Sequence, residues 1–295
     1  ANDLGLSKDP TDTLQILDKE KVLADVIWAI RKFQPDVIVN RFDHRSPGTT
    51  HGHHTASAML SVESFDLANN PTIFPEQLKF VKPWQAKRQF FNSSWWFYGS
   101  IEKFNAADKT NRIAIQTGVY YPGVGKSNQE IAALSRSRHQ SQGFGSTGVR
   151  GEETEYLEFI NGDALKEKKS LFEGIDTTWN RVKGGKPIGE LLTKITVEFD
   201  HKNPSGSIPN LLKAYSMLQA LDDNHWAPLK SAEIKEIIVA CSGLYLEAVA
   251  QNQEATPGSN IKLKLEAINR SSIPMQLLSV TSLPNIIKTA QNQDL

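Results

Sequence analysis

Apolar side chains recur at helical spacing along residues 10–33, the first long segment of the chain. The stripe is formed by Leu17, Val22, Leu23, Val26, Ile27, Ile30 and Phe33. This spacing follows one face of a helix, so it predicts a single amphipathic helix. Asp9 and Pro10 suit its first turn, and Pro35 ends it.

A β-branched run, DVIVNRF at residues 36–42, comes directly afterwards. A short apolar segment bounded by proline and charge predicts a buried strand. The loop DHRSPGTTHG follows, and a second helix is expected from about residue 53 to residue 67. Helix, strand, loop and helix in this order are typical of an α/β layer built on a parallel sheet.

The alternation of strands and helices continues in residues 87–140. KRQFFNSSWWFYG and NRIAIQTGVYY are strand-like, and the helical segment SNQEIAALSRSRHQ follows them. Ser127 and Glu130 have the spacing of a capping box at the start of that helix. Ligands of such sheets bind beyond the carboxyl ends of the strands, so the loop after residues 36–42 is where a site is expected.

The second half of the chain has a different pattern. IGELLTKITVEF, SIPNLLKAYSMLQALDDN and SAEIKEIIVACSGLYLEAVAQNQ are helical, whereas NIKLKLEAI and MQLLSVTSL read as strands. The expected fold class is α/β, with a partial, Rossmann-like parallel-sheet layer in residues 1–150. A helical region follows in residues 151–255, and the β-strands of residues 256–295 are expected to begin a β-sandwich of Ig-like kind.

Charge and composition exclude several functions. Lysine plus arginine equals aspartate plus glutamate, 33 against 33, so no net field attracts nucleic acid, and no nucleic-acid partner is expected. No apolar run approaches the ~20 residues that a membrane span needs. The single cysteine allows neither an internal disulfide nor a CxxC metal motif.

The segment TTHGHHTASAML at residues 49–60 carries the candidate chemistry. His51 and His54 are three apart at a helix start, so both can serve one metal, or one can ligate while the other acts on a substrate. We expect Asp43 to orient a histidine and His53 to face away. Two alternatives remain open: a hydrated polar helix start, and a local metal site made from Asp43, His44, His51 and His54.

FQPDVIVNRFDHRSPGTTHGHHTASAML, residues 33–60, resembles the second conserved block of the PIG-L (LmbE-like) zinc-dependent N-deacetylases. That block has a Pro-Asp-Val strand, a loop aspartate, and His-x-x-His-x-Ala opening a helix. EIAALSRSRHQSQ, residues 130–142, is similar to the family's late helix, which ends in His-x-Ser-Gln. The two stretches occur in the family's order.

The resemblance implies a role for each matching residue. His54 is then a zinc ligand, and His51 is the protonated histidine that stabilises the oxyanion and assists the leaving amine. Asp43 lies behind them, and Arg45 and His139 are candidate substrate contacts. A helix-capping or packing role for His139 is an equal alternative. The implied reaction removes acetyl from an N-acetylated amino sugar or glycoconjugate, with zinc as cofactor.

The departures from the family pattern matter as well. Ala-His-Pro-Asp-Asp-Glu, the family's first block with two zinc ligands and the catalytic base, does not occur in this sequence, and Gly52-His53 replaces the usual Pro-Asp. We therefore expect the chain to be the C-terminal part of a bacterial-type catalytic domain, with the remainder N-terminal to it as partner. A non-catalytic carbohydrate-binding or scaffold module is the alternative. The terminal strands suggest an extracytoplasmic or periplasmic setting.

Overall fold

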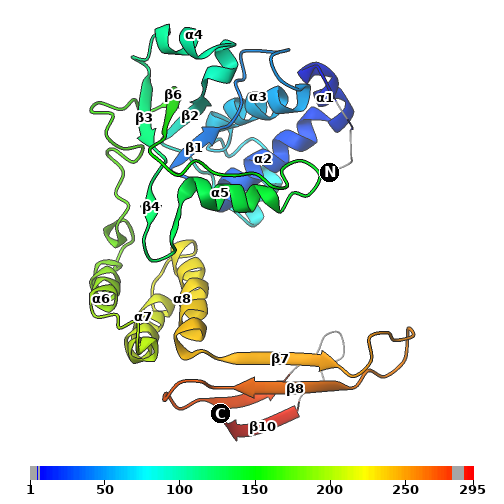
Figure 1. Cartoon of the computed structure of the whole chain (residues 1–295), viewed down its shortest axis with the longest axis vertical. Coiled ribbons are helices and arrows are strands. Elements are labelled where there is room, and N and C mark those ends of the chain that lie inside the picture. Colours follow the sequence, from blue (N-terminus) through cyan, green and yellow to red (C-terminus); the bar gives the residue numbers. More distant parts are fainter. Residues whose placement is uncertain (1–4, 6, 281–288) are drawn as a thin grey trace. The chain divides into compact units, whose positions relative to one another are not determined.

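The computed structural model describes residue 5, residues 7–280 and residues 289–295. The chain is a mixed α/β protein with two compact units, Ala1–Ile175 and Asp176–Leu295 (Figure 1). Each unit has a hydrophobic core of its own.

A four-stranded sheet with the order β1-β2-β6-β3 is the centre of the first unit. Its strands are Val37–Asn40 (β1), Arg88–Ser93 (β2), Arg112–Gln116 (β3) and Thr154–Gly162 (β6). β1 and β2 are parallel, with Asn40 beside Phe91, whereas β6 runs antiparallel to both β2 and β3. β1, β2 and β3 consequently point the same way, and the loops that follow them emerge at one edge of the sheet.

The sheet is therefore mixed, and the expectation of a parallel sheet is only partly right. β1, β2 and β3 lie where the apolar patterns predicted strands. β6 was missed, because it falls in the region expected to be helical and carries the charged residues Glu155 and Glu158. Those charges have partners on other elements, since Asn92 donates to Glu155 and Arg45 donates to Glu158.

Three helices accompany the sheet: Pro10–Leu17 (α1), Lys19–Phe33 (α2) and Gly52–Leu67 (α3). The core between α2 and α3 contains Leu23, Ile27, Ile30, Leu60 and Ala68. The single helix expected over residues 10–33 is interrupted at Asp18, where φ is 61°. The Asp18 carbonyl then accepts from the N–H groups of Lys21 and Val22, and these bonds begin α2.

Shorter elements complete the first unit. They are Pro75–Lys79 (η1, a 3₁₀ helix), Trp95–Tyr98 (η2, also 3₁₀), Ile101–Ala106 (α4), Tyr120–Tyr121 (β4), Lys126–Ser127 (β5) and Asn128–Ser137 (α5). The predicted capping box is confirmed: the Ser127 hydroxyl accepts from the Glu130 N–H, and the Glu130 carboxylate accepts from the Ser127 N–H. The aromatic stretch after β2 forms η2 instead of extending the strand.

Three helices share one core in the second unit: Lys186–Val197 (α6), Ile208–Gln219 (α7) and Trp226–Ser242 (α8). Two 3₁₀ turns, Trp179–Arg181 (η3) and Pro204–Ser207 (η4), connect to them. The buried members of this core are Ile188, Ile195, Leu211, Ala214, Leu218 and Ile234. The three predicted helices are thus confirmed as far as residue 242.

The last of these helices is shorter than its sequence pattern. α8 ends at Gly243, whose φ of 59° is a left-handed conformation that glycine adopts without steric cost. The Gly243 N–H donates to the Ala240 carbonyl, and the Leu244 N–H donates to the Val239 carbonyl. The remainder of the pattern, Tyr245–Ala250, forms strand β7 and was wrongly expected to be helical.

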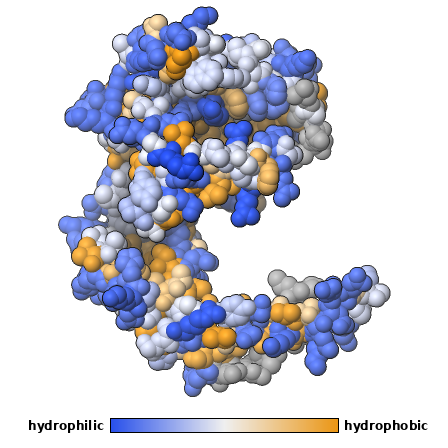
Figure 2. Space-filling model, in the orientation of Figure 1, coloured by the Kyte–Doolittle hydropathy of each residue, from blue (hydrophilic) through white to orange (hydrophobic). Residues whose placement is uncertain are grey.

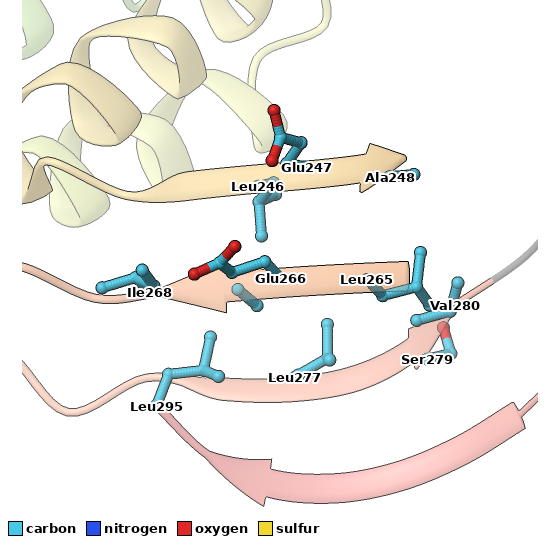
Figure 3. A pocket seen from close by; sticks show the side chains of 11 residues that line it. Leu246, Glu247, Ala248, Leu265, Glu266, Ile268, Leu277, Ser279, Val280 and Leu295 are labelled. Carbon is cyan, nitrogen blue, oxygen red and sulfur yellow. The ribbon is translucent and has the colours of Figure 1, made fainter. Parts of the chain in front are cut away.

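The strands that end the chain form two antiparallel pairs. β7 pairs with Leu263–Ile268 (β8), and Gln276–Val280 (β9) pairs with Thr289–Asp294 (β10). β8 and β9 confirm two predicted strands, although residues 281–283 of MQLLSVTSL lie outside the described residues. Between the described pairs runs a groove of about 740 Å³, lined by residues of both (Figure 3).

Within the part of the chain that the structure describes, no helix combines the length and the apolar character needed to span a bilayer.

Arg31 on α2 is fully buried, which is rare for arginine. Its guanidinium donates only to uncharged oxygens: the carbonyls of Ala68, Asn70, Ile73 and Phe74, and the side-chain amide of Gln77. All these acceptors lie just after α3 or in η1. Arg31 therefore ties the carboxyl end of α3 to α2.

Replacing Arg31 by Met is expected to lower the free energy of unfolding by about 3–4 kcal/mol, because several buried acceptors lose their donor together. Lys32→Met is the matched control, since Lys32 is the next residue of α2 and is exposed. Urea unfolding followed by circular dichroism measures both variants. Equal losses in the two would contradict this role of Arg31.

Candidate metal centre

The loop from β1 to α3 brings the histidines to the carboxyl edge of the sheet. β1 ends at Asn40, and α3 begins at Gly52 with His51 as its N-cap. The backbone of His51 is extended, with φ −65° and ψ 147°, so its side chain does not follow helical spacing. The extended backbone of His51 therefore sets where its own ring lies relative to the first turn of α3.

Gly52 fixes where the helix starts. Its N–H donates to the Ser7 carbonyl over 2.9 Å, which docks α3 on the segment before α1. A Cβ at residue 52 would overlap the carbonyl of Asp9. Proline, the usual residue here in the family that the sequence resembles, has no N–H to donate. The hydrogen bond to Ser7 and the lack of room for a Cβ together explain why residue 52 is glycine in this chain.

His51, His53 and His54 converge in one cluster, in which one ring nitrogen of each lies within 4.8 Å of the others. The ring centroids are 5.5 Å apart for His51 and His54, and 4.2 Å apart for His53 and His54. The expectation that His53 faces away is wrong. It followed from helical spacing, which does not apply to the extended His51.

Phe42 holds the ring of His54. The two rings stack with centroids 4.0 Å apart and planes 11° from parallel. Burial lowers the pKa of His54, and the neighbouring His53 and His51 lower it further by repelling a second positive charge. His54 therefore stays neutral at lower pH than a free histidine, which is the form that binds metal.

The donor set fits a divalent transition metal. Zinc bonds imidazole nitrogen at about 2.0–2.1 Å, so tetrahedral ligand atoms lie roughly 3.4 Å apart. Ligand atoms already within 4.8 Å reach that spacing by small side-chain rotations. The buried Nδ1 of His53 has no hydrogen-bond partner among the described residues, which leaves it available. Imidazole suits zinc, copper and nickel, so the cluster can hold a metal ion whose identity the ligands alone do not select.

Asp43 is engaged by other residues. Its carboxylate accepts from the Arg45 side chain over 2.8 Å, from the Arg45 N–H over 3.0 Å and from the Ser46 hydroxyl. Burial acts to raise the pKa of Asp43, but the bonds from Arg45 outweigh it and hold that pKa below its ordinary value. Arg45 also donates to Glu158 on β6 over 2.7 Å. Asp43 and Arg45 thus brace the loop against the sheet.

The other candidate residues lie outside the cluster. His44 Nδ1 is 3.7 Å from Asp43 and makes no hydrogen bond among the described residues. Burial lowers the pKa of His44 more than Asp43 raises it. His139 is exposed just after α5, with its Nδ1 3.3 Å from the Ser141 hydroxyl. The described cluster contains neither Asp43 nor His44, so the local site expected from those two with His51 and His54 is not the one observed.

The neighbouring loops bring further polar groups to the same edge. Arg41, directly after β1, donates to the Asn92 side chain on β2, and Asn92 donates to Glu155 on β6. His53 is the cluster member that sequence reasoning missed. The signal for it was the HGHH spacing combined with an N-cap position for His51, which frees the first ring from helical geometry.

Comparisons with protein-family models, with curated proteins and with solved structures found no match to this chain.

Substituting Gly52 by Ala is expected to lower the free energy of unfolding by about 2 kcal/mol, since the added methyl group overlaps backbone atoms. Gly123→Ala is the matched control: no atom lies within 4 Å of a Cβ built there, and its backbone needs no positive φ. Thermal unfolding of both variants makes the test. A Gly52→Ala protein as stable as the wild type would show that the helix start tolerates a side chain.

Stability is expected to fall as the pH decreases through about 6.5, the ordinary histidine value. Burial lowers the pKa values of His44, His54 and His225 in the folded state, so below pH 6.5 the unfolded chain binds protons that the folded chain does not. Urea unfolding over this pH range measures the slope. His44→Gln removes one of the three groups and should make the slope shallower; an unchanged slope would exclude His44 as a contributor.

Proposed function

We propose that this chain carries part of the active site of a zinc-dependent N-deacetylase, which removes acetyl from an N-acetylated amino sugar or glycoconjugate. The observation that supports it is the cluster of His51, His53 and His54 at the carboxyl edge of the sheet. The motif resemblance adds support, since it implies a zinc ligand at His54 and an oxyanion-stabilising histidine at His51. In this proposal the mixed sheet is the second part of a Rossmann-like layer, and the terminal strand pairs begin a β-sandwich.

The three histidines divide into two roles in the proposal. His54, oriented by Phe42, holds the metal, and His53 is a second ligand because its buried Nδ1 has no described partner. His51 is the exposed member, so it can meet the substrate, hold a proton beside the developing oxyanion and give that proton to the leaving amine. When bound, zinc would supply Lewis-acid polarisation of the acetamide carbonyl and activation of a water nucleophile.

In this proposal Asp43 has a positioning role. Its ion pair with Arg45, which also reaches Glu158, holds the loop between β1 and α3 in place. Arg45 and His139 remain the proposed substrate contacts. The remaining ligands and a carboxylate base belong, in the proposal, to a partner segment N-terminal to this chain, and the extracytoplasmic setting is proposed with them.

A non-catalytic metal- or carbohydrate-binding module is the second candidate. One observation favours it: within the described residues, the cluster consists of histidines alone and contains no carboxylate that could serve as general base. Without such a base, the cluster can bind a metal or a ligand but has nothing to activate water. Both candidate functions therefore predict metal binding, but only the deacetylase predicts turnover of a substrate.

Zinc titration by calorimetry tests the site, on this chain and on a chain extended N-terminally through the family's first block. We expect one zinc per extended chain and at least a tenfold loss of affinity in His54→Ala, because one ligand is removed. His53→Ala should lose affinity as well. His139→Ala, an exposed histidine outside the cluster, is the control and should bind zinc normally.

Acetate release from an N-acetylglucosaminyl substrate separates the two candidate functions. The extended chain should be active, and His51→Ala should lower kcat by roughly 10²–10³-fold, the usual effect of losing a proton donor or oxyanion contact. Zinc binding without acetate release by the extended chain would support the non-catalytic module. No zinc binding by either chain would refute the enzyme.

A further inference from the structure

β8 has one edge without a strand partner. Within the described residues it pairs only with β7, in a register that places Val249 beside Lys264. The Gln251 N–H donates to the Lys262 carbonyl directly opposite, so the backbone groups of Lys262, Lys264 and Glu266 point toward β7. By alternation, those of Leu263, Leu265 and Ala267 point toward the other edge.

The side chains on this strand pair are largely exposed. Leu246 on β7 is 61% exposed, and Leu265 and Leu263 on β8 are 51% and 49% exposed. In the close view these strands form one wall of the groove between the two pairs (Figure 3). Apolar side chains are also visible at the surface of the strand region of the second unit (Figure 2). An open strand edge next to exposed leucines is a template for another strand.

The charges along β8 are unbalanced within a single chain. Glu247 and Glu266 lie directly opposite each other across β7 and β8, and like charges in that position are destabilising. Lys264 and Glu266 are two residues apart on the same face, and neither has an ion-pair partner among the described residues. Glu266 thus lacks the cation that would compensate Glu247.

We propose that β8 pairs antiparallel with β8 of a second copy of this chain, about a two-fold axis at Leu265. In this register Leu265 lies opposite Leu265 of the second copy, and Leu263 lies opposite Ala267. These are the residues whose backbone groups point to the open edge, so the pairing supplies roughly six interchain hydrogen bonds.

The same register also gives Lys264 and Glu266 partners of opposite charge. Lys264 of each copy lies opposite Glu266 of the other, at the non-hydrogen-bonded positions where cross-strand side chains are closest. A corresponding register on the free edge of β7 would place Glu247 opposite Val249 and form no ion pair. The leucines of both copies meet on one face of the resulting four-stranded sheet. Charge and hydrogen-bond direction therefore select β8 and a second copy of it.

The interface is a single pair of short strands, so its area is at the low end for specific protein contacts. The dimer is consequently concentration-dependent, with a dissociation constant in the micromolar range. Sedimentation velocity of the whole chain over a wide concentration range measures it. EDTA is present throughout, so that no metal ion bridges two histidine clusters.

Charge reversal tests the register. Lys264→Glu alone and Glu266→Lys alone each create two repulsive pairs in the homodimer, and each should weaken it by roughly tenfold or more. An equimolar mixture of the two variants should dimerise again, because each copy then offers the charge that the other lacks. Lys262→Glu is the control: it lies opposite Ile268 in the proposed dimer and should leave the dissociation constant nearly unchanged.

Circular dichroism confirms that each variant is folded before its association is measured. A chain that stays monomeric up to millimolar concentration overturns the proposal. A dimer equally affected by Lys262→Glu and Lys264→Glu, or a mixture that fails to recover, overturns the register and with it the assignment to β8.

Discussion

The placement of α3 is the constraint on which the histidine cluster depends, and it is held at both ends by backbone carbonyls. At the carboxyl end, the buried guanidinium of Arg31 binds the Ala68 carbonyl and others after it. At the amino end, the Gly52 N–H donates to the Ser7 carbonyl, and a Cβ at this residue would overlap the Asp9 carbonyl. Neither hydrogen bond joins two charged groups. A helix fixed in this way holds His51, His53 and His54 at the carboxyl edge of the sheet.

The surroundings of His54 favour neutral imidazole over imidazolium. Burial of His54, repulsion by a positive charge on His53 or His51, and the positive end of the α3 dipole all act against a proton there. The nearest carboxylate in sequence, Asp43, is already neutralised by Arg45. Among the described residues, the cluster therefore consists of imidazoles without a carboxylate, and imidazole nitrogens are ligands of borderline divalent metals.

The sheet of the first unit and the strand pairs of the second unit differ in how completely they bury their apolar residues. In the first unit the sheet is covered enough to bury Phe90, Ile113 and Leu157. The paired strands of the second unit instead leave Leu246, Leu263 and Leu265 about half exposed or more. Two-stranded sheets are seldom stable alone, so such strands gain from any further strand that continues them. In the proposed dimer, the positions of Lys264 and Glu266 select β8 of a second copy as that further strand.

Local signals in the sequence determined the helices α2, α3 and α5, and the strands β1, β2, β3, β8 and β9. Their periodicity, capping residues and prolines act within a few residues, so no distant partner is needed to recognise them. The sequence also indicated the loop of residues 43–54 as the site, since it follows a buried strand. His51 and His54 were identified for the same local reason.

Only the tertiary structure decided the rest, because it depends on residues far apart in the chain. β6 enters the sheet between β2 and β3, and its glutamates are acceptable in a strand only because Asn92 and Arg45 meet them. His53 joins the cluster because the N-cap conformation of His51 departs from helical spacing, and that conformation is set by the docking of Gly52 on Ser7. Asp43 braces the loop because Arg45 can reach both it and β6. Each of these features depends on a contact between segments that are not joined by any local sequence pattern.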